Sequence, residues 1–168
     1  MVKLNLGGGE QDMVGWETVD LFSSNPKYRI DLTKFPWPFA DKSVDATAMF
    51  HVLEHVEDTE KTVMEVHRIL KTGGEFWVVV PHAKNPAACD LSHRHFFTCV
   101  TFRNHTEQTW YRFGGKRLFQ TVFFRMPLVN HRLLKWTPLD PIANNFPYFF
   151  EKFVPFAPAY IEWKGIAV

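Results

Sequence analysis

The sequence predicts an α/β protein built on a doubly wound, mostly parallel, Rossmann-like sheet. Short apolar runs alternate with turns or a helix-forming segment through residues 1–81. Strands that are apolar on both faces are typical of parallel sheets covered on both sides. Three glycines follow the first run, and an aspartate ends the second. That pattern is typical of α/β folds that bind an adenosine-containing ligand, although a glycine cluster can also form a plain tight turn.

Four strands are expected in the first half, at residues 2–6, 17–21, 44–50 and 75–80, with 28–32 as a weaker fifth. The link from Gly7 to Trp16 has ten residues, so any helix there has at most a turn or two. Residues 58–74 predict one clear helix. Asp58 or Thr59 caps its start, and Gly73 or Gly74 stops it. Strand, helix and strand form a right-handed parallel crossover.

The second half predicts a helix at 98–113 and strands at 116–126 and 159–168. Residues 138–158 are dense in proline and phenylalanine, which fits an irregular cover of the core, a substrate lid, a subunit interface or a membrane-surface contact. Lid or interface is favoured, because Pro147, Pro155 and Pro158 disfavour an interfacial helix.

The formal charge of +1 hides an asymmetry. Residues 1–81 carry 8 Lys/Arg against 13 Asp/Glu, a net of −5, and residues 82–168 carry 11 against 5, a net of +6. Of the 27 aromatic residues, 18 lie in the second half. A single domain over 1–168 is expected, with a cofactor-binding half at 1–81 and a substrate or lid half at 82–168.

Targeting and redox signals are few. The sequence has neither a transmembrane run of about 18 apolar residues nor a signal-peptide core, so a cytoplasmic protein is expected. Cys89 and Cys99 lack the spacing of a zinc site and predict packed thiols.

Six short motifs occur in series: LNLGGG (4–9), VDL (19–21), PF (38–39), DKSVD (41–45), HVLEH (51–55) and RILKTGG (68–74). In this order and spacing they resemble the class I S-adenosylmethionine-dependent methyltransferases, in particular small domains of the type-11 kind. The resemblance spans about residues 3–100. It implies S-adenosylmethionine as cofactor and a seven-stranded sheet whose last strand is antiparallel. Because the chain starts on its first strand, a minimal form without the N-terminal helix is expected.

The resemblance also implies roles for single residues. Gly7 and Gly9 would pass under the methionine part of the cofactor, and Asp20 would bind the ribose hydroxyls. Asp31 would lie by the adenine, and His51 would border the sulfonium. The alternative for both aspartates is a solvated strand end. The full set of expected cofactor contacts is Leu6, Gly7, Gly8, Gly9, Asp20, Leu21, Asp31, Leu32 and His51.

Methyl transfer depends largely on proximity and orientation, so no catalytic residue is obligatory. His51 and His93 are the predicted catalytic residues, since imidazole accepts protons near neutrality. Asp90 and His93 resemble a D-x-x-H element of the family. Asp90, His93 and His95 could suit a metal, but this short spacing is poorly diagnostic, and no metal is predicted.

The predicted reaction is methyl transfer to an oxygen or nitrogen atom of a small-molecule or glycan acceptor, possibly anionic. Nucleic acid is less favoured, because no Lys/Arg-rich run or binding module occurs and the N/D-P-P-Y element of base-amine methyltransferases is absent. The rivals are a catalytically silent cofactor-binding partner subunit and a nicotinamide-dependent oxidoreductase. A homo-oligomer is possible. The candidate acceptor contacts are Arg94, Arg103, Arg112, Lys116 and Arg117.

Overall fold

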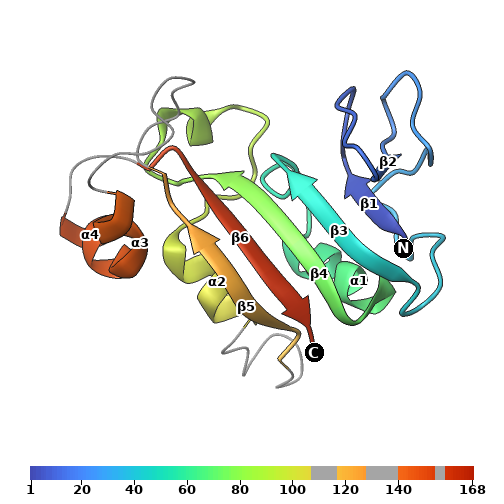
Figure 1. The fold of residues 1–168 in the computed structure, drawn as a ribbon. Coiled ribbons are helices and arrows are strands. Elements are labelled where there is room, and N and C mark those ends of the chain that lie inside the picture. Colours follow the sequence, from blue (N-terminus) through green and yellow to red (C-terminus); the bar gives the residue numbers. More distant parts are fainter. Residues whose placement is uncertain (107–116, 128–139, 154–157) are drawn as a thin grey trace.

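A six-stranded sheet lies at the centre of the protein, as seen in a computed structural model that describes residues 1–106, 117–127, 140–153 and 158–168 (Figure 1). Its strand order is β2-β1-β3-β4-β6-β5. Neighbours from β2 to β4 are parallel, and β6 runs antiparallel to both β4 and β5. The expected mostly parallel, Rossmann-like fold with an antiparallel last strand is therefore confirmed, but the described sheet has six strands rather than the seven that the resemblance implied. The strands are β1 (Lys3–Leu6), β2 (Glu17–Val19), β3 (Val44–Phe50), β4 (Leu70–Pro81), β5 (Phe119–Arg125) and β6 (Tyr160–Ala167).

The described helices are α1 (Thr59–Ile69), α2 (Cys99–Thr106), α3 (Asp140–Asn145) and α4 (Pro147–Phe153), and a 3₁₀ turn, η1, spans Pro86–Cys89. Asp58 caps α1 as predicted, because its side chain accepts a hydrogen bond from the Lys61 N–H. Among the described helices, none has the length and apolarity needed to cross a bilayer.

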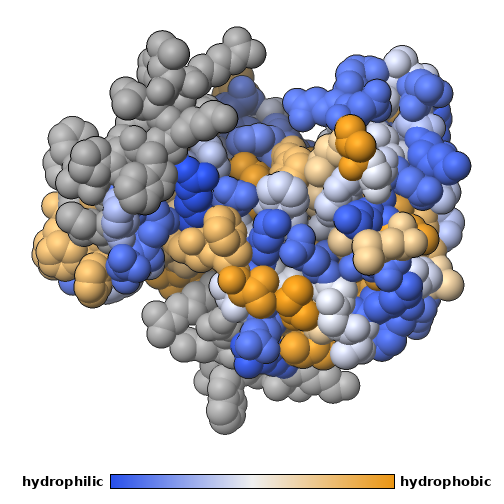
Figure 2. All heavy atoms as spheres, in the orientation of Figure 1, coloured by the Kyte–Doolittle hydropathy of each residue, from blue (hydrophilic) through white to orange (hydrophobic). Residues whose placement is uncertain are grey.

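One face of the sheet is packed and the other is partly open. Phe76, Trp163 and Phe119 are buried on the face that α1 and α2 cover, and Phe102 of α2 stacks on Trp163 at 5.1 Å. Figure 1 shows both helices behind the sheet, with no described helix in front of it. On the near face Trp77 is half-buried, and the Lys164 Nζ atom lies 3.9 Å from its ring centroid. Figure 2 shows polar and apolar residues mixed over this face.

Several boundaries differ from the sequence predictions. Helix α1 ends at Ile69 rather than at the glycines, because Leu70 is already extended and pairs with Val44. Residues 71–74 therefore belong to β4. The weak strand at 28–32 is reduced to a single bridge between Tyr28 and Val19. Loops replace the helices of an ordinary Rossmann fold in residues 7–16 and 20–43.

The proline- and phenylalanine-rich segment is helical where the structure describes it. Pro147 occupies the first position of α4, where its missing N–H costs nothing. Phe146, Tyr148 and Phe153 are exposed, whereas Phe150 is buried. Residues 138, 139 and 154–157 of the predicted lid and residues 107–113 of the predicted helix lie outside the described residues.

Candidate active site

The glycine loop follows β1 at the edge where the parallel strands end. Gly7 has φ +71, and its N–H donates to the Val19 carbonyl at 2.7 Å. An added Cβ at Gly7 would lie 2.7 Å from a methyl of Val52. Only glycine therefore fits both the left-handed backbone and the close approach to the turn after β3.

Asp20 is fixed by backbone donors. Its Oδ1 accepts from the N–H groups of Phe22 at 2.7 Å and Ser23 at 2.8 Å, and its Oδ2 accepts from Gly9 at 2.9 Å. Burial alone would raise the pKa of Asp20, but these three hydrogen bonds lower it below the ordinary range. Asp20 therefore stays ionised and ties the glycine loop to the end of β2. A carboxylate has about four acceptor positions, so capacity remains for a ligand.

The Asp31–Thr33 turn forms one wall of a cavity that Gly7 and Asp20 also line. The Asp31 Oδ1 atom accepts from the N–H and hydroxyl of Thr33, and both bonds lower the pKa of Asp31. The Leu32 carbonyl accepts from the Trp37 indole at 3.2 Å. The wall is thus anchored to a tryptophan that is 2 % exposed.

Arg68 supports the segment that contains Trp37. Its guanidinium bonds both oxygens of Glu65 at 2.6 and 2.9 Å and Asp41 at 2.5 Å. It also donates to the carbonyls of Trp37 and Phe39. Burial raises the pKa of Glu65, but Arg68 and the Trp37 N–H outweigh burial and lower it. The DKSVD and RILKTGG motifs therefore meet in an ion-pair network that supports the cavity without lining it.

His51 directly follows β3 and has an unusual backbone. Its φ is +55, although its N–H still pairs with the Val79 carbonyl of β4 at 2.8 Å. Left-handed conformations are uncommon outside glycine and cluster at functional sites. The His51 Nδ1 atom lies 3.3 Å from Oε1 of Glu54, which is fully buried. The imidazole itself is 56 % exposed and available to a ligand.

Residues 92–95 dock against the turn that follows His51. The backbone carbonyl of Glu54 accepts from the N–H groups of Arg94 at 2.7 Å and His95 at 3.3 Å. This pairing brings the His93 and His55 rings to 4.7 Å between centroids. Two segments almost 40 residues apart in the sequence therefore lie side by side.

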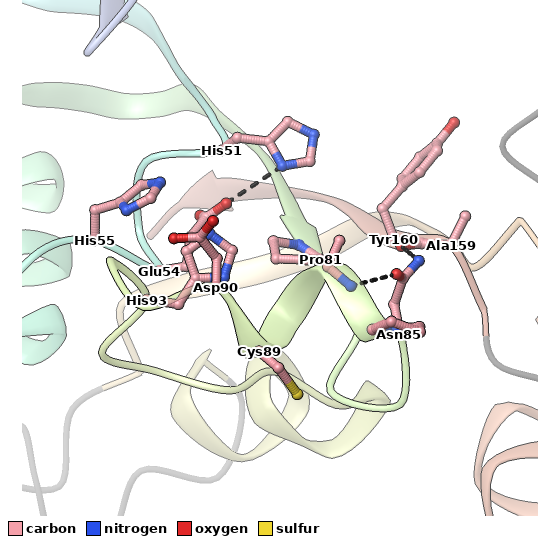
Figure 3. A pocket seen from close by; sticks show the side chains of 12 residues that line it. His51, Glu54, His55, Pro81, Asn85, Cys89, Asp90, His93, Ala159 and Tyr160 are labelled. Carbon is pink, nitrogen blue, oxygen red and sulfur yellow. Dashed lines mark hydrogen bonds and ion pairs between the residues drawn. The ribbon is translucent and has the colours of Figure 1, made fainter.

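Two cavities meet at this point. The first, of about 300 Å³, is lined by six of the expected cofactor contacts: Gly7, Asp20, Leu21, Asp31, Leu32 and His51. The second, of about 500 Å³, is lined by His51, Glu54, His55, Asp90, His93 and Tyr160, among others (Figure 3). His51 and His55 line both cavities. We call them the cofactor pocket and the acceptor pocket, after the roles that we propose for them.

Other expected contacts lie elsewhere. Leu6 is buried in the core, and Gly8 and Gly9 do not line the cofactor pocket, although Gly9 donates to Asp20. His95 bonds the Val56 carbonyl rather than joining His93. Arg94 faces Glu57 at 4.0 Å, and Arg117 precedes β5 at the opposite edge of the sheet. Arg103 lies in α2, and Arg112 and Lys116 fall outside the described residues.

The sequence interpretation missed several lining residues, Glu54 and Tyr160 among them. Glu54 was not among the predicted site residues, because its burial cannot be read from the HVLEH motif. Tyr160 was not considered. It enters the acceptor pocket because β6 runs antiparallel and begins at the edge where β3 and β4 end.

Comparison with known proteins agrees with this geometry. Residues 18–78 match the family described as "Methyltransferase domain". A methyltransferase from Haloferax volcanii, solved in complex with the Trm112 methyltransferase activator, superposes with a TM-score of 0.63 at 15% identity, over 99% of this chain and 81% of that one. The chain has the class I methyltransferase fold. The matched segment is of the type-11 kind.

Two further methyltransferase structures are similar. A S-adenosylmethionine-dependent methyltransferase from Archaeoglobus fulgidus has a TM-score of 0.64 at 14% identity, over 98% of this chain and 85% of that one. The geranyl diphosphate C-methyltransferase of Streptomyces coelicolor was solved with Mg²⁺, geranyl diphosphate and S-adenosylhomocysteine. It has a TM-score of 0.55 at 14% identity, over 99% of this chain and 73% of that one. No curated protein matches the sequence. Family and fold together support a methyltransferase with S-adenosylmethionine as cofactor.

Proposed function

We propose that this methyltransferase binds S-adenosylmethionine in the cofactor pocket and transfers its methyl group to an oxygen or nitrogen atom held in the acceptor pocket. The observation that carries the proposal is the junction of the two cavities at His51 and His55. The cofactor pocket lies at the carboxyl ends of β1 and β3, where the strand order reverses. Open α/β sheets bind ligands at this switch point.

The proposed cofactor pose follows the pocket walls. The methionine part lies against the backbone of Gly7, which lines the pocket. The ribose hydroxyls donate to Asp20, and the adenine lies between Leu21 and the Asp31–Thr33 turn. The sulfonium then faces His51, so that the methyl group points toward the acceptor pocket.

The reaction needs little from the protein beyond placement. A lone pair on the acceptor atom forms the new bond to the methyl carbon while the carbon–sulfur bond breaks, and its electron pair stays on sulfur as S-adenosylhomocysteine. The acceptor must lose a proton if it is a hydroxyl or an ammonium. His51 is the proposed base: when Nδ1–H donates to Glu54, its Nε2 carries a lone pair. His93 lines the same pocket as a second candidate.

The proposed acceptor is a small metabolite or a single glycan unit. A cavity of about 500 Å³ is the size of ordinary small-molecule sites. No arginine or lysine lines it among the described residues, so the expected arginine contacts find no support there. Histidines, Asp90 and Tyr160 instead favour an acceptor rich in hydroxyl groups over nucleic acid.

A thermal-shift comparison tests cofactor binding. Ligand at about 100 times its Kd stabilises by ~2.7 kcal/mol, which raises Tm by roughly 5–10 °C for a chain of this size. S-Adenosylhomocysteine should give this shift, and NAD should give none. A shift with NAD alone would favour the oxidoreductase, and a shift with neither would overturn the proposal.

A second candidate is a cofactor-binding subunit that needs a protein partner for activity. Two observations favour it: the half-open Trp77 face of the sheet, and the Trm112 activator in the complex of the Haloferax volcanii relative. Turnover by the chain alone, at a single-subunit mass in light scattering, would exclude this candidate. Cofactor binding without turnover on any hydroxyl or amine acceptor would favour it.

A further inference from the structure

We propose that Glu54, His55 and His93 bind a divalent transition-metal ion, with zinc as the expected occupant, at the inner end of the acceptor pocket. One ligand atom from each residue lies within 4.8 Å of the other two. This set differs from Asp90, His93 and His95, the combination that the sequence suggested and for which no metal was expected. In Figure 3 the three side chains gather on one side of the cavity, below His51.

Glu54 supplies the first argument. Its side chain is fully buried, and its Oε2 atom has no hydrogen-bond partner. His51 approaches only the other oxygen, Oε1. A buried carboxylate oxygen without a donor is costly, and few such atoms occur in native proteins. A cation on Oε2 would satisfy it.

The two histidines supply the second argument. The Nδ1 atom of His55 lies 3.2 Å from the Ser92 carbonyl, and that of His93 lies 3.2 Å from the Ala88 carbonyl. A carbonyl can only accept, so each Nδ1 carries the hydrogen, and each Nε2 holds the lone pair in the neutral ring. Metal-binding histidines are oriented in this way, with the second ring nitrogen bonded to a carbonyl or carboxylate.

The ligand types indicate the metal. Two imidazoles and one carboxylate suit zinc and similar ions, whereas magnesium and calcium prefer sites made of oxygen. A zinc ion with bonds of about 2.0–2.2 Å needs ligand atoms closer together than 4.8 Å. The exposed His55 ring can turn to close this gap, because within the described part of the chain it makes one hydrogen bond, to the Ser92 carbonyl.

Three protein ligands leave coordination positions open toward the pocket, as in catalytic rather than structural zinc sites. If the proposed function holds, oxygen atoms of the acceptor fill these positions beside His51. The site therefore selects acceptors that present a hydroxyl, carboxylate or phosphate oxygen to the metal. Metal binding itself does not depend on methyl transfer.

The experiment is a calorimetric titration of zinc chloride into untagged protein from which metals have been removed with EDTA, repeated with cobalt chloride and visible spectroscopy. We expect one zinc ion per chain with a Kd of about 1 µM or tighter, and a cobalt spectrum typical of four- or five-coordination. Glu54→Gln and His93→Asn should each weaken binding at least about tenfold. Circular dichroism checks that both variants fold. If Glu54→Gln does not fold, His93→Asn alone tests the site.

Two control variants lie close to the site. His95→Asn removes an imidazole from the same loop, and Cys89→Ser removes an exposed thiol from the same pocket. Zinc affinity should stay within about twofold in both. The proposal is wrong if zinc binds more weakly than about 100 µM, if the Glu54 and His93 variants bind as well as the parent, or if either control loses as much affinity as they do.

S-Adenosylhomocysteine titrated into the same samples separates this inference from the proposed function. Cofactor binding without zinc binding overturns only the metal site. Zinc binding without cofactor binding overturns only the methyltransferase proposal.

Discussion

The two pockets that meet at His51 are built in opposite ways. In the cofactor pocket the polar groups are already bonded to the chain: Asp20 accepts three backbone N–H groups, and Asp31 bonds its own turn. In the acceptor pocket an oxygen of Glu54 has no partner, and the His51 ring is more than half exposed. The carboxylates of the cofactor pocket are therefore held by hydrogen bonds within the protein, whereas the acceptor pocket contains a carboxylate oxygen without a hydrogen-bond partner.

We therefore expect the cofactor pocket to position its ligand and the acceptor pocket to supply the groups that react. The motifs that carry the family resemblance mostly serve the first pocket, through glycine geometry and the Arg68 network. The second pocket uses histidines and an acid whose partners come from a distant loop. Variants on the two sides should therefore fail in different measurements.

The largest expected effect is a loss of unfolding free energy when the ion-pair network of Arg68 is broken. Arg68→Ala leaves Glu65 buried without its partner, which should cost ~3–5 kcal/mol of unfolding free energy. At roughly 2–4 °C per kcal/mol, Tm should fall by about 6–20 °C. S-Adenosylhomocysteine affinity should fall too, because Trp37 and the Leu32 wall lose their anchor.

Lys61→Ala is the matched control in the same helix. Its ion pair with Asp58 is exposed, so unfolding free energy should change by less than about 0.5 kcal/mol. Equal losses in the two variants, measured by urea unfolding, would show that the Arg68 network is no more than a surface contact.

The next effect falls on turnover. His51→Asn keeps a residue that tolerates the left-handed backbone but removes the base, so turnover should drop about a hundredfold. Cofactor affinity should stay within a few fold. His67→Gln in α1 is the control, since His67 contacts the C-terminal residue far from both pockets. A fall in Tm with unchanged turnover would make His51 a packing residue.

A smaller effect is expected in cofactor affinity. Asp20→Asn keeps one acceptor oxygen but loses the charge that we propose pairs with the ribose hydroxyls, which should cost ~1.5–3 kcal/mol, or roughly tenfold to hundredfold in Kd. Asp12→Asn, an exposed acid in the glycine loop, should leave the Kd unchanged. Calorimetry with equal affinities for both variants would remove Asp20 from the site.

The smallest expected effect is a pH dependence of the unfolding free energy that comes from Glu151. Glu151 of α4 accepts from His82 at 2.7 Å and from the Cys99 N–H at 2.6 Å. Burial would raise the pKa of Glu151, but these bonds outweigh it and lower the pKa. A lowered pKa contributes stability at neutral pH that is lost as pH falls through the folded-state value, below the usual value of about 4.3.

Glu151→Gln should therefore be less stable than the parent at pH 7, and the gap should close as pH falls from about 5 toward 3. Urea unfolding across this range measures it. A gap that widens in acid would contradict the assigned direction of the pKa.

The sequence predicted most of the strands, because apolar runs carry local signals, and it named six residues that line one cavity at the carboxyl edge of the sheet. It placed the end of α1 wrongly, since pairing of Leu70 with Val44 overrides the glycine stop signal. It could not predict the cluster of Glu54, His55 and His93, because the Arg94 and His95 N–H groups meet the Glu54 carbonyl only in the folded chain. Burial of one acid beside two histidines is a tertiary property that spacing does not carry.

The most direct test of the account is a crystal structure with S-adenosylhomocysteine. The account predicts density over the glycine loop, with the ribose hydroxyls on Asp20, the adenine by the Asp31–Thr33 turn and the sulfur facing His51 at the junction of the two pockets. Ligand bound elsewhere, or bound with its sulfur turned away from the acceptor pocket, would contradict it.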